Sequence, residues 1–149
     1  MRILLVLDAN ILIYALSGTT ERSELYRRFV EELVAGEFPF VVPDLCMLSV
    51  ARIAMNRRIH PPPGRPSTAS EVTGFLSALR ASRARVDVPV TDQVWARFFE
   101  FLAFPWVGTE HSTDAFVAAL TIENDGRLIT ADRGFARFPG LRFADPVRR

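Results

Sequence analysis

The sequence predicts an α/β fold in which helices flank a mostly parallel β-sheet, within a single domain over residues 1–149. Short apolar runs without alternation, such as residues 3–7, are typical of parallel strands buried on both faces. Helical patterns separate these runs, and strand–helix alternation without an internal repeat favours one parallel sheet. A chain of 149 residues, 49% of them hydrophobic, is long enough to bury a core.

The hydrophobic pattern divides the chain into alternating elements. We expect strands over residues 3–7, 38–42, 85–90, 127–130 and 141–143. We expect helices over residues 11–16, 21–35, 45–55, about 68–80, 94–104, 115–124 and 135–138. The third strand belongs at an edge of the sheet, because Pro89 has no backbone N–H to donate.

Local signals justify most of these boundaries. Three predicted helices follow residues whose side-chain oxygen can accept a hydrogen bond from a free backbone N–H: Thr19 and Thr20, Ser67 or Thr68, and Thr91-Asp92. Asp44 is placed to cap the third helix in the same way. Prolines keep residues 60–67 out of regular structure, which makes them a stiff connection inside the domain.

The predicted helix over residues 94–104 carries more apolar side chains than one core-facing stripe needs. They are Val94, Trp95, Phe98, Phe99, Phe101, Leu102 and Phe104. Either this helix is central and packed on two sides, or part of it forms a surface for another subunit or a protein partner. Both interpretations can hold together.

The composition excludes several classes of protein. All 18 basic residues are arginine, so P-loop and Schiff-base sites, which need a lysine, are absent. The single cysteine, Cys46, excludes an internal disulfide and a multi-cysteine zinc site. Without a membrane-spanning apolar run or a signal-peptide pattern, we expect a cytoplasmic protein with no membrane contact. Because the net charge is only +1, nucleic-acid binding requires local clusters of arginine.

Three aspartates occupy comparable positions around the expected sheet. Asp8 and Asp132 each follow a buried strand, and Asp114 stands at the beginning of a helix. If the two strands are neighbours, these carboxylates emerge at the edge where α/β proteins bind ligands. Carboxylates held close together repel each other, and a hard divalent ion such as Mg²⁺ or Mn²⁺ relieves that repulsion. The pattern favours metal-dependent hydrolysis of phosphodiester bonds by a metal-activated water.

Three motifs stand in a characteristic order and spacing: LDANIL over residues 7–12, Asp114-Ala115 with Ala118-Ala119-Leu120, and LITADRGF over residues 128–135. Together they resemble the PIN-domain ribonucleases, in particular the VapC toxins of bacterial type II toxin–antitoxin pairs. The resemblance covers the whole chain and implies an α/β/α sandwich around a mostly parallel sheet of about five strands. It also implies a Mg²⁺-dependent endoribonuclease toxin that forms a homodimer and is neutralised by a cognate antitoxin.

The same resemblance assigns roles to individual residues. Asp8, Asp114 and Asp132 match the catalytic, metal-binding acids of the family. Asn10 and Thr130 match positions that support the site.

One position departs from the family pattern. Ser49 stands where these proteins normally carry a glutamate, and a neutral hydroxyl cannot balance a divalent charge. Glu110, four residues before Asp114, shares a face with it if the helix begins early enough, and Asp44 is a second candidate to compensate. The alternative function is therefore a catalytically weak PIN-like module that binds RNA or a protein partner.

Contact with RNA requires positive charge near the acids. The candidates for binding RNA phosphates are Arg52, Arg57, Arg58 and Arg133. Single-stranded or loop RNA is the expected substrate, because its bases are accessible. A phosphatase that uses Asp8 as a nucleophile is disfavoured, because the chain has no lysine and carries Asn10 where a second acid would stand.

Overall fold

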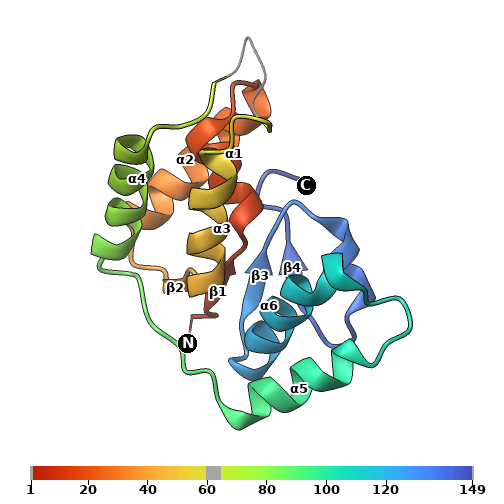
Figure 1. Ribbon diagram of the computed structural model, residues 1–149. Coiled ribbons are helices and arrows are strands. Elements are labelled where there is room, and N and C mark those ends of the chain that lie inside the picture. The colour runs from red at the N-terminus through yellow and green to blue at the C-terminus, as the bar shows by residue number, and fades with distance from the viewer. Residues whose placement is uncertain (1, 60–64, 149) are drawn as a thin grey trace.

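The computed structural model of the protein describes residues 2–59 and 65–148 (Figure 1). Within these ranges four strands form one sheet in the order β2-β1-β3-β4, and every neighbouring pair is parallel. The strands are β1 (Leu5–Leu7), β2 (Phe40–Val41), β3 (Arg127–Ile129) and β4 (Phe143–Ala144). The predicted α/β fold with a parallel sheet is confirmed, with four strands where about five were expected.

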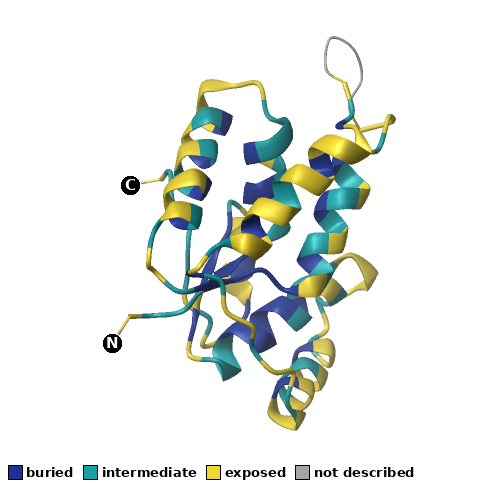
Figure 2. Cartoon of the chain, turned by 90° about the vertical axis from the view of Figure 1, so that its left-hand side faces the viewer, coloured by how far each residue is buried: buried dark blue, intermediate teal, exposed yellow. Residues whose placement is uncertain are grey.

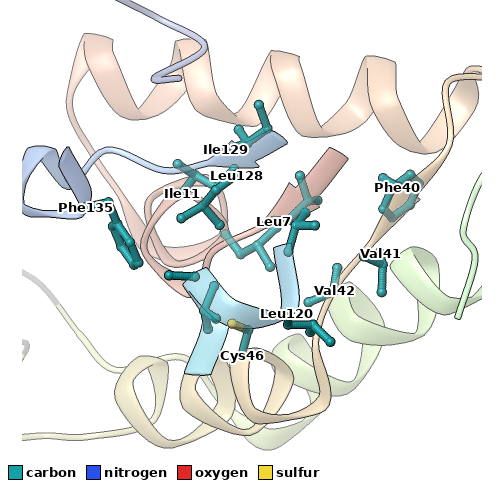
Figure 3. Close-up of a cluster of buried hydrophobic side chains, with 14 of the residues drawn as sticks. Leu7, Ile11, Phe40, Val41, Val42, Cys46, Leu120, Leu128, Ile129 and Phe135 are labelled. Atoms are coloured by element: carbon teal, nitrogen blue, oxygen red, sulfur yellow. The ribbon is translucent and has the colours of Figure 1, made fainter. Parts of the chain in front are cut away.

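Helices cover both faces of this sheet. They are α1 (Ala9–Ser17), α2 (Glu21–Ala35), α3 (Asp44–Ala54), α4 (Ala69–Ala81), α5 (Asp92–Leu102) and α6 (Ser112–Glu123), with 3-10 turns η1 (Thr109–His111) and η2 (Arg133–Arg137). Figure 3 shows α2 along one side of the strands and α3 with α6 on the other. No helix in the described part of the chain is long and apolar enough to cross a membrane. Residues 60–64 of the predicted proline-rich connection lie outside the described residues.

The predicted edge strand over residues 85–90 is reduced to a single bridge beside β2. The Phe40 N–H donates to the Ala84 carbonyl at 3.1 Å, and the Val86 N–H donates to the Phe40 carbonyl at 2.8 Å. Since β2 has only two residues, it offers little backbone for further pairing, and Pro89 has no N–H to continue the ladder. This explains why the fifth strand is missing from the described sheet.

The helix starts follow the predicted capping chemistry with one exception. The hydroxyls of Thr20, Thr68 and Thr91 each accept a hydrogen bond from the backbone N–H three residues further on, as predicted. The cap assigned to Asp44 is wrong, because Pro43 occupies the N-cap position and forms no side-chain hydrogen bond there. Asp44 is instead the first residue of α3, where its charge still complements the helix dipole.

The core lies between the strands and the inward faces of the helices. Leu7 of β1, Phe40 of β2 and Leu128 of β3 are fully buried. In the close-up of Figure 3 they lie on one side of Cys46 of α3 and Leu120 of α6. Figure 2 shows that most of β1, β2 and β3 is buried, while helices such as α2 and α4 are buried mainly along one side. Burial on both faces of the sheet explains why its strands are continuous apolar runs.

Helix α5 lies at the periphery of the molecule, so the interpretation of a central helix packed on two sides is wrong (Figure 1). It packs mainly against α6 and buries Val94 and Phe101. Trp95, Phe99 and Leu102 remain 42%, 60% and 39% exposed. The alternative, a surface for another subunit or partner, stays a prediction.

Candidate active site

The carboxyl ends of β1 and β3 lie side by side, because these strands are neighbours in the sheet. Asp8 directly follows β1, and Thr130 and Asp132 follow β3. The Asp8 N–H donates to the Ile129 carbonyl at 3.0 Å, which extends the pairing beyond β1 and places Asp8 beside the end of β3. Two of the three predicted acids therefore emerge at the same edge of the sheet.

Helix α6 brings the third acid to this edge. It begins on the side of the molecule where β1 and β3 end, and Asp114 lies in its first turn (Figure 1). Fully buried alanines, Ala115, Ala118 and Ala119, let the helix pack closely on the core. The charges of Asp8 and Asp132 both raise the pKa of Asp114, so the three carboxylates interact electrostatically.

Thr130 is the centre of the hydrogen-bond network beneath the carboxylates. Its hydroxyl is 1% exposed and donates to Asp8 Oδ2 at 2.8 Å. The hydroxyl oxygen of Thr130 in turn accepts hydrogen bonds from Asn10 Nδ2 and from the Asp132 N–H, each at 3.1 Å. Because these two donors occupy the lone pairs of the hydroxyl, its single proton is directed to Asp8. The predicted supporting roles of Asn10 and Thr130 therefore have a geometric basis.

The carboxylates differ in how many donors they meet. Asp8 Oδ1 accepts from the Ala9 N–H at 2.8 Å, so Asp8 caps α1 as well as bonding to Thr130. Asp132 Oδ1 accepts from the Gly134 N–H at 2.8 Å. Asp132 Oδ2 and both oxygens of Asp114 accept no hydrogen bond from the described residues, so they are available to a ligand.

The electrostatics favour a bound cation. Burial raises the pKa of Asp8, and the charge of Asp132 adds to the rise, while hydrogen bonds oppose it. Burial, together with the charges of Asp8 and Asp132, raises the pKa of Asp114 to about 6, and His111 opposes this rise. Across residues 2–59 and 65–148 none of the three carboxylates forms an ion pair. In the described part of the chain, His111 offsets only part of the mutual repulsion of these three acids.

The donor set fits a hard divalent ion in charge and chemistry, because its oxygens are carboxylate oxygens. No group of three or more His, Cys, Asp or Glu side chains in the described ranges is already arranged to hold a metal ion. Mg²⁺ usually keeps several waters and binds through one or two protein carboxylates, so it does not require such a preformed cage.

The structure does not bring a fourth acid to the site. Ser49 is half-buried on α3, and its hydroxyl donates to the Leu45 carbonyl of the same helix at 2.9 Å. Glu110 lies in η1, before α6 begins, and its side chain is 74% exposed beside His111. Asp44 is exposed at the start of α3. Neither Glu110 nor Asp44 contributes to the raised pKa of the site aspartates.

Cys46 is a neighbour of the acids that was not predicted from the sequence. It lies on α3, three residues before Ser49, and is 1% exposed. Burial and the charges of Asp8 and Asp114 raise the pKa of its thiol, so it stays neutral. The sequence signal for a position of Cys46 near the acids is its spacing of three residues from Ser49, which puts both residues on the same side of one helix.

The predicted RNA-binding arginines lie at different places. Arg133 lines a cavity of about 220 Å³ together with Thr130 and Asp132. Arg52 is exposed on α3, and Arg57 and Arg58 are exposed in the turn that follows it. Of the four candidates, Arg133 is the one that shares a cavity with site residues.

A larger groove of about 870 Å³ lies beside the site. Its walls come from the end of α1, the start of α2 and the C-terminal segment, and they include Tyr14, Arg22 and Arg148. These residues were not predicted from the sequence, because segments more than a hundred residues apart meet here only in the folded chain.

Comparisons with known proteins agree with this geometry. The chain matches the PIN domain family over residues 5–141. It is 30% identical to Ribonuclease VapC43 of Mycobacterium tuberculosis over 144 residues, which cover 97% of this chain and 96% of that protein. Ribonuclease VapC31 of the same species is 28% identical over 141 residues, or 95% and 97% of the two chains.

A solved structure shows the same fold. The crystal structure of VapBC2 from Rickettsia felis, bound to a DNA fragment from their promoter, contains a chain that superposes with a TM-score of 0.65. The sequences are 14% identical, and the superposition covers 95% of this chain and 97% of the other. The motifs, the parallel sheet and these matches lead to one conclusion: the chain belongs to the PIN-domain family, with VapC ribonucleases among its relatives.

Proposed function

We propose that this protein is a VapC-like endoribonuclease toxin that cleaves RNA phosphodiester bonds with the help of Mg²⁺ or Mn²⁺. The observation that carries the proposal is the group of three mutually repelling carboxylates, Asp8, Asp114 and Asp132, at the carboxyl edge of the sheet. The relatives named as ribonucleases support the same chemistry.

These three aspartates are the residues that would hold the cation. When bound, such an ion acidifies an attacking water and offsets charge on the phosphate and on the departing oxygen. Thr130 supports this role, because its proton is directed to Asp8 Oδ2 and favours the ionised form of that carboxylate. Asn10 and the Asp132 N–H hold the Thr130 oxygen in place, so the two strands keep a common orientation.

Cleavage of a structured RNA with accessible loops, such as a tRNA, tests the proposal. We expect Asp8→Asn to abolish Mg²⁺-dependent cleavage, because the amide lacks the charge that holds the ion. Asp87→Asn is the control, since that side chain is 83% exposed and pairs with the neighbouring Arg85. Thermal unfolding of both variants confirms folding, and cleavage by Asp8→Asn at the parent rate would overturn the proposal.

The second candidate is a catalytically weak module that binds RNA or a partner. It is favoured by Ser49, whose hydroxyl bonds to its own helix rather than to the acids. Ser49→Glu discriminates between the two: a large gain in cleavage over a weak parent supports the impaired site. An active parent that gains nothing from Ser49→Glu contradicts it.

The proposed partners are RNA, a second copy of this chain and a cognate antitoxin. The exposed apolar side chains of α5, Trp95, Phe99 and Leu102, support a protein interface. Sedimentation of the isolated chain and binding of the product of an adjacent small gene test these partners. A clean monomer without affinity for that product would contradict both protein partners.

A further inference from the structure

The groove lies next to the candidate active site. Ala131, which stands between Thr130 and Asp132, lines the groove of about 870 Å³. Ala131 and Arg148 also line the cavity of about 220 Å³ that contains Thr130 and Asp132. Because Ala131 and Arg148 line both spaces, the groove is a direct neighbour of the cavity at Thr130 and Asp132.

The groove carries an excess of positive charge. Arg22 Nη2 lies 2.8 Å from Asp145 Oδ2, and Arg148 Nε lies 3.5 Å from the same oxygen. The Asp145 side chain is only 10% exposed, whereas those of Arg22 and Arg148 are 47% and 38% exposed. Arg65 of the same lining pairs with Glu71. One buried carboxylate thus anchors two guanidinium groups that face solvent.

Tyr14 forms an aromatic platform in the same wall. Its ring stacks on Tyr26 with centroids 5.3 Å apart and planes 27° from parallel, and Tyr14 is 43% exposed. Tyr26 is 1% exposed, and its hydroxyl donates to Asp145 Oδ1 at 2.9 Å. Arg22 Nη2 donates to the Tyr26 hydroxyl at 3.2 Å. Asp145 therefore fixes both the platform and the arginines.

Exposed arginines beside an open aromatic ring are the elements with which proteins bind single-stranded nucleic acid. Arginine binds backbone phosphates, and the ring stacks on a base. We propose, on the basis of the proposed nuclease function, that this groove binds the single-stranded RNA segment next to the phosphodiester presented to the carboxylates. Tyr14 stacks on one base, and Arg22 and Arg148 contact the phosphates.

RNA binding tests the groove without cleavage. The parent is the Asp8→Asn variant in EDTA, and the probe is a short fluorescent oligouridine followed by anisotropy. We expect Tyr14→Ala to weaken binding by about 10-fold, because it removes one stacked base, and Tyr14→Phe to keep it. We expect Arg148→Gln to weaken binding and to lower the slope of log affinity against log salt by about 0.7, the value for one phosphate contact with a single strand.

Matched controls lie at the opposite, amino end of the sheet. Phe38 precedes β2 and is 39% exposed, and Arg142 precedes β4 and lies 3.5 Å from Asp125. Phe38→Ala and Arg142→Gln are expected to bind the probe like the parent. Parent-like binding by both Tyr14→Ala and Arg148→Gln would overturn the proposal. Competition by an oligoglutamate of equal charge, as strong as that by unlabelled RNA, would instead assign the groove to an acidic peptide.

The groove and the nuclease function can fail separately. If wild-type protein does not cleave RNA in Mg²⁺ but the groove variants lose RNA binding, the nuclease function falls and the groove stands. If wild-type protein cleaves RNA and the groove variants bind normally, only the groove proposal falls.

Discussion

Replacing Asp114 by asparagine is expected to stabilise the metal-free protein at neutral pH. Burial and the charges of Asp8 and Asp132 raise the pKa of Asp114 from 3.8 to about 6. A change of one pKa unit corresponds to about 1.4 kcal/mol. If the whole rise in the pKa of Asp114 acted on folding, it would lower the free energy of unfolding by about 3 kcal/mol. Because Asp114 is only partly buried, solvent screening reduces this to about 1–2 kcal/mol.

The pH dependence distinguishes this cause from others. Since the pKa of Asp114 is higher in the folded state, the folded protein binds a proton that the unfolded chain has already released. Wild-type stability should therefore fall as the pH rises from about 4 to about 6, and the loss is complete above the folded pKa. Asp114→Asn has no carboxyl group to ionise and so keeps this stability. The variant should therefore become more stable than wild type as the pH rises from about 4 to about 6, and the difference should vanish below about pH 4.

Urea and thermal unfolding in EDTA, from about pH 4 to about pH 7, measure the effect. For a chain of this size, about 1–2 kcal/mol corresponds to a rise in Tm of about 2–8 °C. Asp87→Asn, an exposed control, should change stability by less than about 0.5 kcal/mol. An Asp114→Asn variant less stable than wild type at neutral pH, or an advantage independent of pH, would refute the reasoning. Added Mg²⁺ should stabilise wild type more than the variant.

Three further substitutions test other parts of the structure. Thr130→Val removes a buried hydroxyl with three hydrogen bonds and should lower the free energy of unfolding by about 2–4 kcal/mol. Thr130→Ser keeps the hydroxyl and should retain most of the wild-type stability. An unchanged urea midpoint for Thr130→Val would contradict the network. Thr20→Ala removes the cap that accepts from Ser23 N–H at 3.1 Å and should cost about 1 kcal/mol by thermal unfolding, with Thr20→Ser close to wild type. Phe99→Glu places a charge on the exposed face of α5 and should convert a dimer to a monomer in sedimentation, whereas an equally dimeric variant would exclude this face.

Much of the fold was predictable because the signals are local. The apolar runs at β1 and β3 reflect burial on both faces of a sheet, and the threonine caps reflect free N–H groups at helix starts. Asp8 and Asp132 could be placed at one edge, because parallel strands end on the same side of a sheet. The confirmed neighbours β1 and β3 then bring Asp8 beside Thr130.

Other features depended on contacts between distant segments. A broad apolar helix has no sequence signal for which of its sides meets the core, so the peripheral position of α5 was not predictable. The apolar side chain of Leu48 is 72% exposed, because α3 turns Cys46, Val50 and Ala54 inward instead.

The sequence by itself determined the alternation of strands and helices and the presence of aspartates after two buried strands, since both follow from local periodicity and backbone chemistry. Only the tertiary structure decided that Thr130 directs its proton to Asp8, and that Asp145 joins Arg22 to Tyr26 beside the site. The physical reason is separation along the chain: these partners lie more than a hundred residues apart, and the packing of the whole domain brings them within hydrogen-bond distance.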